Sequence, residues 1–194
     1  MASYATVAEL KTYINELTGG VQTSFSVAED ALLQVFLNEA TAEIDRQTGR
    51  KFTAASAVKR YYFSESVTGD TLYLDADLNT LVSLKNGDGT TISEDDLWLL
   101  PINSEVFHAI KLKSTVAWTF GTDGTIEVEG DWGFSGSAPD DIKRVCKRLA
   151  WFYWMKRTAS GETSVVGDSV AVVPAEYPED VMSVLRRYRR GVIR

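Results

Sequence analysis

The spacing of apolar residues changes twice along this chain, and this limits the folds that the chain can adopt. In residues 1–56 and 138–194, apolar side chains recur at helical intervals. Between residues 57 and 137 they fall in short runs rich in β-branched and aromatic residues, as in strands. The pattern predicts an α+β protein, with a helical core of about four helices and a β-rich insert at 57–137. We expect the insert to form a small antiparallel sheet or sandwich.

Two capping boxes predict where the first two helices begin. The Ser/Thr-x-x-Glu spacing occurs at Thr6–Glu9 and again at Ser26–Glu29, and each is followed by apolar residues at helical spacing. Leu32 and Val35 lie off the main apolar stripe of the second helix. We therefore expect this helix to contact a second apolar surface.

Prolines predict the starts of two later helices. Pro139 suits a first helical position, and the acids Asp140 and Asp141 suit the positive end of a helix. Another helix is expected after Pro178. Residues 158–177 lie between these two helices and are predicted to form an extended arm or long loop within the core region.

The strand-like runs of the insert are separated by glycine-rich turn chemistry at residues 86–89 and 121–124. Their short length and regular spacing predict six short antiparallel strands. The runs are AVKRYYF, TLYL, TLVSL, LWLL, AIKLK and TIEVEGDWGF.

The net charge of −7 is unevenly distributed along the chain. Residues 64–141 carry 3 Lys or Arg and 15 Asp or Glu, whereas residues 142–194 carry 11 and 5. Such asymmetry predicts two surfaces with different partners. The acidic balance argues against DNA as the main ligand, because a DNA-binding domain usually carries an unopposed basic surface.

Cysteine content and hydropathy indicate a cellular compartment. Cys146 is the only cysteine, which suits a reducing compartment. No run approaches the roughly 20 apolar residues of a membrane span, and the first residues lack the apolar core of a signal peptide. We expect a protein that is made in the cytoplasm and does not enter a membrane.

No residue set indicates catalysis, and we expect no enzymatic activity, cofactor or metal. His108 is the only histidine, and no nucleophile motif accompanies it. Cys146 falls on an apolar helix stripe, where a thiol acts as a small hydrophobic group. Residues 75–79 resemble the start of a calcium loop, but the later glycine and glutamate are absent. A hydrolase built on the acidic insert is a weaker alternative.

Basic and aromatic residues adjoin one another in the helix expected after Pro139. This combination fits binding to a protein partner, and it also fits nucleic-acid binding by charge and stacking. We favour the protein interface, and a nucleic-acid-binding module that uses this basic face and the C-terminal arginines stays open. The subunit-interface candidates are Lys147, Arg148, Trp151, Trp154 and Met155.

Several segments, taken in order, resemble the head-tail connector (adaptor or head completion) proteins of long-tailed bacteriophages. The resemblance covers most of the chain, and it depends on the order of short pieces. They are DALLQVFLNEATAEID closed by TGR at 48–50, DLWLLP, WTFG at 118–121, EVEGDWGFS leading into PDDIKRVCKRLAWFYW, and LRRYRR at 185–190.

The resemblance implies a non-enzymatic virion protein that forms a ring, usually twelve-fold, below the portal protein. Such a ring extends the DNA channel and joins the filled head to the stopper or tail-completion protein. The implied location is the head-tail junction of a virion assembled in the host bacterial cytoplasm. A tail-completion protein is an alternative. By analogy, the portal-docking candidates are Arg186, Arg187, Tyr188, Arg189 and Arg190.

A connector ring has to let double-stranded DNA pass without binding it specifically. Lysine or arginine contacts to phosphates would hold the DNA, whereas an acidic lumen repels it. We therefore expect acids of the insert to line the channel. The candidates are Asp88, Glu94, Asp95, Asp96 and Asp123.

Overall fold

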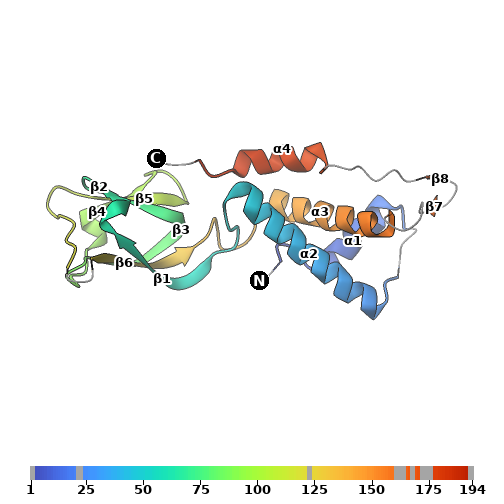
Figure 1. Cartoon of the computed structure of the whole chain (residues 1–194), viewed down its shortest axis with the longest axis horizontal. Coiled ribbons are helices and arrows are strands. Elements are labelled where there is room, and N and C mark those ends of the chain that lie inside the picture. Colours follow the sequence, from blue (N-terminus) through green and yellow to red (C-terminus); the bar gives the residue numbers. More distant parts are fainter. Residues whose placement is uncertain are drawn as a thin grey trace. The chain divides into compact units, whose positions relative to one another are not determined.

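The chain forms two compact units, and together they confirm the predicted α+β fold class (Figure 1). The computed structural model describes residues 3–20, 24–121, 124–159, 165–166, 169–170 and 177–191. A helical unit comprises Met1–Arg50 and Ala138–Arg194, and a β unit comprises Lys51–Ser137. The β unit begins before residue 57, because the backbone at residues 51–54 already pairs with residues 134–135.

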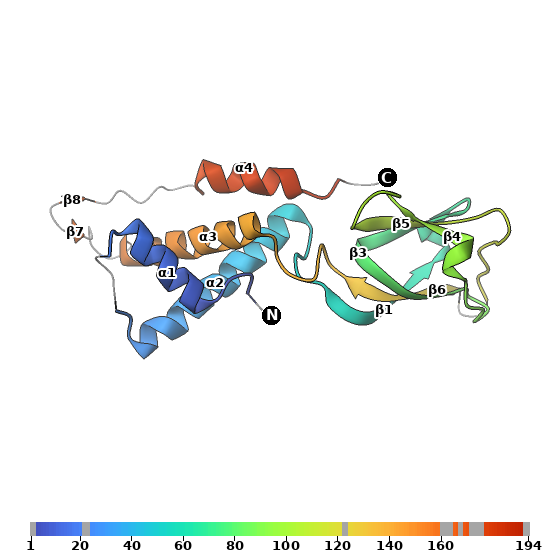
Figure 2. The ribbon, with the colours of Figure 1, turned by 180° about the vertical axis from the view of Figure 1, so that it is seen from behind.

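The described residues of the helical unit form four helices, and α3 contacts the other three (Figures 1 and 2). Both predicted capping boxes are present, at Thr6–Glu9 and Ser26–Glu29. The helices are α1 (Val7–Leu17), α2 (Val27–Thr48), α3 (Asp140–Ala159) and α4 (Glu179–Tyr188).

The predicted arm at residues 158–177 begins inside α3, which continues to Ala159. Two short strands follow, β7 (Val165–Val166) and β8 (Ser169–Val170), and they pair with each other. Residues 160–164, 167–168 and 171–176 lie outside the described residues.

Cys146 lies in the core between α2 and α3, as its place on the apolar stripe predicts. Its side chain is fully buried, and its Sγ lies 3.6 Å from the Thr41 hydroxyl oxygen. Burial raises the pKa of the thiol, which keeps it protonated and unreactive. Cys146 therefore acts as a packing residue.

Within the described residues, the β unit forms a single antiparallel sheet of six strands rather than two packed sheets. Its order is β1-β6-β3-β5-β4, with β2 paired to β3. Two short 3-10 helices also occur, η1 (Ser64–Ser66) and η2 (Glu94–Asp96). The strands are β1 (Ala55–Phe63), β2 (Val67–Thr68), β3 (Thr71–Lys85), β4 (Leu97–Leu100), β5 (Phe107–Leu112) and β6 (Thr125–Trp132).

β3 is one long strand, where the sequence predicted two. Its first half pairs with β5 and its second half with β6, and Leu78 is the residue that pairs with both. Leu72, Leu74 and Leu78 are buried in one alternation, and register shifts at Leu78–Thr80 and Leu81–Ser83 then move the buried positions to Leu81 and Leu84. The prediction was wrong here because a bulge changes the phase of the alternation without ending the strand.

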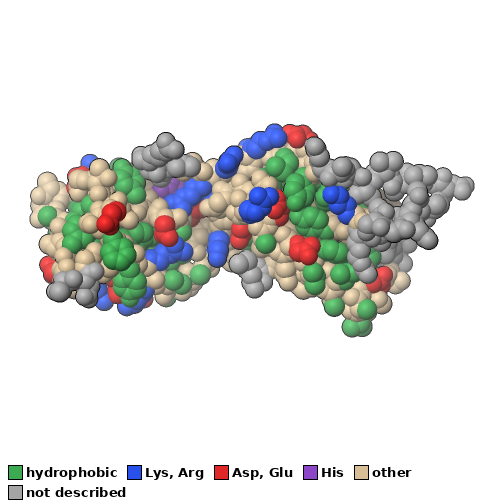
Figure 3. All heavy atoms as spheres, viewed as in Figure 1, with side chains coloured by type: hydrophobic (Ala, Val, Ile, Leu, Met, Phe, Trp, Pro, Cys, Tyr) green, Lys and Arg blue, Asp and Glu red, His purple; other side chains and the backbone are tan. Residues whose placement is uncertain are grey.

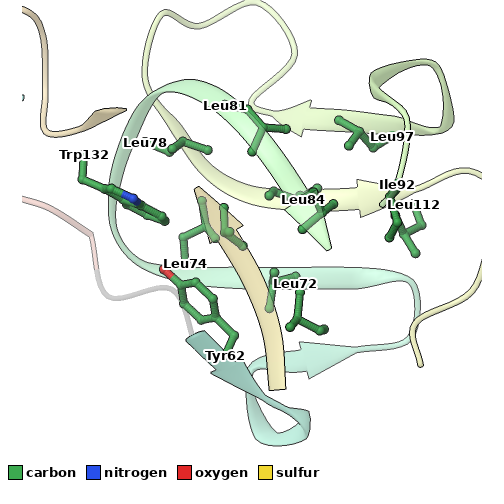
Figure 4. Close-up of a cluster of buried hydrophobic side chains, with 13 residues drawn as sticks. Tyr62, Leu72, Leu74, Leu78, Leu81, Leu84, Ile92, Leu97, Leu112 and Trp132 are labelled. Carbon is green, nitrogen blue, oxygen red and sulfur yellow. The ribbon is translucent and has the colours of Figure 1, made fainter. Parts of the chain in front are cut away.

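Side-chain contacts join β1 to β6 and to the first half of β3. The rings of Tyr62 and Trp132 lie 6.2 Å apart in the core cluster (Figure 4). The Tyr62 hydroxyl donates a hydrogen bond to Asp75 over 2.6 Å, and Arg60 contacts the same carboxylate at 2.7 Å. Partial burial opposes ionisation of Asp75, but these two partners outweigh it and lower the pKa of the carboxyl. The contacts to Asp75 therefore connect β1 to the first half of β3, although these two strands are not paired with each other in the sheet.

Gly130 in β6 offers a test of this packing. A methyl group there would lie 2.5 Å from both the Leu78 side chain and the Thr80 carbonyl oxygen. Gly130→Ala should lower the free energy of unfolding by about 1–3 kcal/mol, because the crowded backbone has to shift. Urea unfolding followed by tryptophan fluorescence measures the effect. Gly136→Ala is the control, since nothing lies within 4 Å of its added methyl; equal losses in both variants would contradict the prediction.

Candidate docking surfaces

α4 places two of the predicted docking arginines on its outer face. Val181, Val184 and Leu185 are buried, whereas Arg186 and Arg187 are exposed. Lys and Arg side chains gather over this helix in Figure 3. The amphipathic pattern therefore packs the apolar side of α4 and leaves its guanidinium groups at the surface.

Polar contacts fix α4 to α3. Asp180 Oδ2 lies 2.7 Å from Arg148 Nε, and the Tyr188 hydroxyl donates to Asp141 over 2.9 Å. Burial of the Tyr188 ring and this hydrogen bond raise the pKa of Tyr188. Arg148 and Tyr188 were predicted as interface and docking residues, and in this structure each holds α4 in place within the chain.

Arg50 anchors the segment that follows α4, a role that the sequence analysis missed. Its Nε donates to the Tyr188 carbonyl over 2.7 Å, and the Arg190 N–H donates to the Thr48 carbonyl over 2.8 Å. Gly49 between these two residues has a φ of +66°, the left-handed conformation that ends α2. The one sequence signal for this contact was a cation directly after a helix-ending glycine.

The guanidinium groups of Arg186, Arg187 and Arg189 have few competing partners among the described residues. Arg186 pairs with Glu179 at 2.7 Å, but both side chains are exposed, so the pair contributes little stability. Arg187 is 3.9 Å from Asp141. Arg189 is exposed and makes no ion pair within the described residues. A carboxylate on a partner protein has access to this surface.

Of the predicted interface residues near the end of α3, Trp154 packs inside the helical unit. Trp154 is only 8% exposed, and its ring centroid lies 6.3 Å from that of Phe25 and 6.4 Å from that of Phe36. Trp154 thus joins α3 to α2. Trp151 and Met155 are half-buried and leave apolar surface near the end of α3.

The net negative charge of the chain belongs to the β unit. Residues 51–137 carry 6 Lys or Arg and 13 Asp or Glu, whereas the helical unit carries 14 of each. Acids of the sheet are paired in part: Glu127 lies 3.1 Å from Lys59 and 3.2 Å from Lys85. The hydrogen bond from Lys59, with Lys85 beside it, lowers the pKa of Glu127.

Four of the five predicted channel acids are among the described residues, and they lie in a turn and in η2 instead. Asp88, Glu94 and Asp95 are exposed, and none of them forms an ion pair in the part of the chain that the structure describes. Asp96 is half-buried and accepts a hydrogen bond from the Thr115 hydroxyl over 3.2 Å. Asp123 falls outside the described residues.

The calcium-like segment at residues 75–79 is part of β3, and no group of three or more His, Cys, Asp or Glu side chains in the described residues could hold a metal ion. Asp77 in this segment is buried, and its Oδ1 lies 3.3 Å from His108 Nδ1. None of the described helices combines the length and the apolar character that crossing a membrane requires.

Two solved structures of neck proteins share the fold of this chain. One comes from the neck of an empty GTA particle, computed with C6 symmetry: the TM-score is 0.66 and the identity 22%, over 98% of this chain and 91% of that chain. The other comes from the neck of a native GTA particle with C12 symmetry, at a TM-score of 0.58 and 20% identity, over 99% and 96%. No protein-family model and no curated protein matches the sequence.

These likenesses confirm, at the level of the fold, the resemblance to head-tail connector proteins. GTA particles are phage-like gene transfer agents, and the matching chains are parts of their necks.

The anchor at Arg50 can be tested directly. Arg50→Met removes the charged donor that holds the Tyr188 carbonyl, so the segment from Arg186 to Arg190 should open more often. We expect trypsin to cleave within this segment about tenfold faster, in line with the loss of a hydrogen bond to a charged group. Arg46→Met removes an exposed cation that pairs with Glu43 on the same helix, and it should leave the cleavage rate unchanged. No difference between the two variants would contradict the anchoring role.

Proposed function

We propose that this chain is a structural protein of the neck of a phage-like particle. In this proposal it forms a ring below the portal protein, extends the DNA channel, and joins the filled head to a stopper or tail-completion protein. Assembly takes place in the host bacterial cytoplasm, and the role requires no catalytic site.

The observation that carries the proposal is the extent of the structural match. The GTA neck protein with the higher TM-score covers nearly all of this chain, and this chain covers 91% of it. The likeness thus includes both the helical unit and the β unit. A chance similarity between helical bundles would match the helical unit alone. The C6 and C12 symmetries of the two neck structures support an assembly of repeated subunits.

Charge within the helical unit favours a head-to-tail ring. α1 and α2 together carry seven acids and two Lys or Arg, whereas α3 carries six Lys or Arg and two acids. A ring of this type brings two different faces of each subunit together, so opposite charges on those faces select the correct contact.

α2 supplies an apolar surface for the same contact. Val27 is 87% exposed and Val35 is 47% exposed, and Ala31 between them is also exposed. Four-residue spacing places all three on one face of the helix. The second apolar surface that the sequence predicted for α2 would then belong to a neighbouring subunit, together with Trp151 and Met155.

Portal docking is assigned to the surface formed by Arg186, Arg187 and Arg189. Their guanidinium groups are exposed, and Arg50 fixes the backbone that carries them. The planar fork of arginine suits bidentate binding of carboxylates on a partner protein.

The channel is assigned to the β unit, and its net charge of −7 supports this. Acids paired with lysines contribute little to the field, whereas the exposed Asp88, Glu94 and Asp95 have no such partners among the described residues. Their field would repel DNA phosphates and let the duplex slide. Asp123 stays a channel candidate by sequence.

The nucleic-acid alternative has weaker support, because at least three of the six cations of α3 have partners within the chain. Lys143 pairs with Asp140 at 3.7 Å, and Arg148 pairs with Asp180. The Lys147 Nζ lies 5.8 Å from the centre of the Tyr13 ring.

The docking surface can be tested by replacing Arg186, Arg187, Arg189 and Arg190 with Ala together. The variant should stay folded, because the buried side of α4 is unchanged, and it should no longer bind portal-containing heads. Pull-down of heads and circular dichroism measure the two properties.

The control is a variant with the same loss of charge in the β unit. In it, Ala replaces Lys59, Lys85, Lys111 and Lys113. This control should bind heads normally. Normal head binding by the arginine variant would overturn the docking assignment. Binding to tails but not to heads by the unaltered protein would favour the tail-completion alternative.

The channel proposal predicts that the protein does not retain DNA. In a gel-shift titration with duplex DNA at low salt we expect no retarded band, because the acidic β unit repels the phosphates. Binding through several phosphates would instead give a band whose affinity falls about a thousandfold between 50 and 200 mM salt. Such a band would support the nucleic-acid-binding module.

A further inference from the structure

An apolar groove of about 470 Å³ opens on the β unit between β3 and β4. Leu81 on β3 and Leu97 on β4 line it, and both belong to the edge of the core cluster (Figure 4). Trp98, 47% exposed, and Ile102, 61% exposed, stand at its rim. A contiguous apolar surface of this kind, unlike a single exposed side chain, marks an interaction site.

Two strand edges border this groove. β4 pairs with β5 on one side, and its other edge has no partner strand in the described structure. β3 pairs with β6 over residues 80–85, and along residues 80–83 its opposite edge has no partner strand among those described. An unpaired edge beside apolar side chains accepts an extended peptide, which adds main-chain hydrogen bonds to the sheet.

The arm of the chain has the sequence of such a peptide. Five valines occur between residues 165 and 173, a composition typical of strands and unlike that of an exposed linker. The run SVAVV at 169–173 ends at Pro174, which cannot continue a ladder. Its length suits the four residues of β4. The β7–β8 hairpin has two residues in each strand, too few to be stable alone.

We propose that the groove binds the arm of a second copy of this chain, with residues 169–173 added as a strand at the β4 edge. This inference depends on the proposed ring, which places a second copy beside every subunit. A head-to-tail ring fills each groove with the arm of one neighbour, so that no subunit keeps an unpaired β4 edge. The groove is open in the single chain, as a site filled on assembly would be.

Disulfide crosslinking between two full-length variants tests the contact. One carries Ile102→Cys at the groove rim, and the other carries Val172→Cys in the arm and a different affinity tag. After mixing and mild oxidation we expect a disulfide-linked heterodimer. The buried Cys146 serves as an internal control, because the unaltered chains should not crosslink. Tyr61→Cys on β1 is the matched control for the rim, since Tyr61 is 57% exposed and does not line the groove.

Proximity should give about tenfold more heterodimer with Ile102→Cys than with Tyr61→Cys, because bound arms raise the effective concentration of the two thiols. Equal yields would overturn the proposal. A chain carrying both Ile102→Cys and Val172→Cys should crosslink to other copies; a crosslink confined to the single chain would overturn the second-copy assignment.

Electron microscopy of the same samples separates this proposal from the ring. If rings form but no heterodimer does, the groove contact is overturned and the ring proposal stands. A heterodimer without rings supports the groove contact and counts against the ring. If neither forms, both proposals fail.

Discussion

The two-unit architecture depends on a short stretch of backbone pairing that holds the ends of the β unit together. The Phe134 N–H donates to the Lys51 carbonyl and the Ala54 N–H to the Ser135 carbonyl, both over 2.8 Å. The rings of Phe52 and Phe134 lie 5.4 Å apart beside them. Because the chain leaves and returns at neighbouring positions, α2 and α3 can pack directly although 91 residues separate them in sequence.

This arrangement allows the two units to carry different charge. The helical unit has equal numbers of acids and cations, and its exposed arginines are held by Arg50 and by the contacts between α3 and α4. The β unit holds all of the net charge. Lysines pair with Glu127 in its sheet, whereas Asp88, Glu94 and Asp95 form no ion pair among the described residues. Under the proposed function, one unit binds proteins and the other repels DNA.

Local signals predicted local structure well. The capping boxes, the helix starts after Pro139 and Pro178 and the burial of Cys146 all agree with the structure, because each depends on residues close together in sequence. Contacts between distant segments were missed. Arg50 reaches Tyr188, and Trp154 packs against Phe36, and neither pairing leaves a mark on the local pattern. The continuous β3 was missed because a bulge and a strand end look alike in sequence.

By itself the sequence determined the fold class, the order of helices and strands, and the uneven charge along the chain, since periodicity and composition are local properties. The tertiary structure decided which charges remain available to partners. It pairs Glu127 with lysines and leaves Asp88 exposed, it places Arg148 inside a helix contact, and it opens a groove beside β4. The physical reason is that a charge or an apolar side chain is available only when no distant segment covers it.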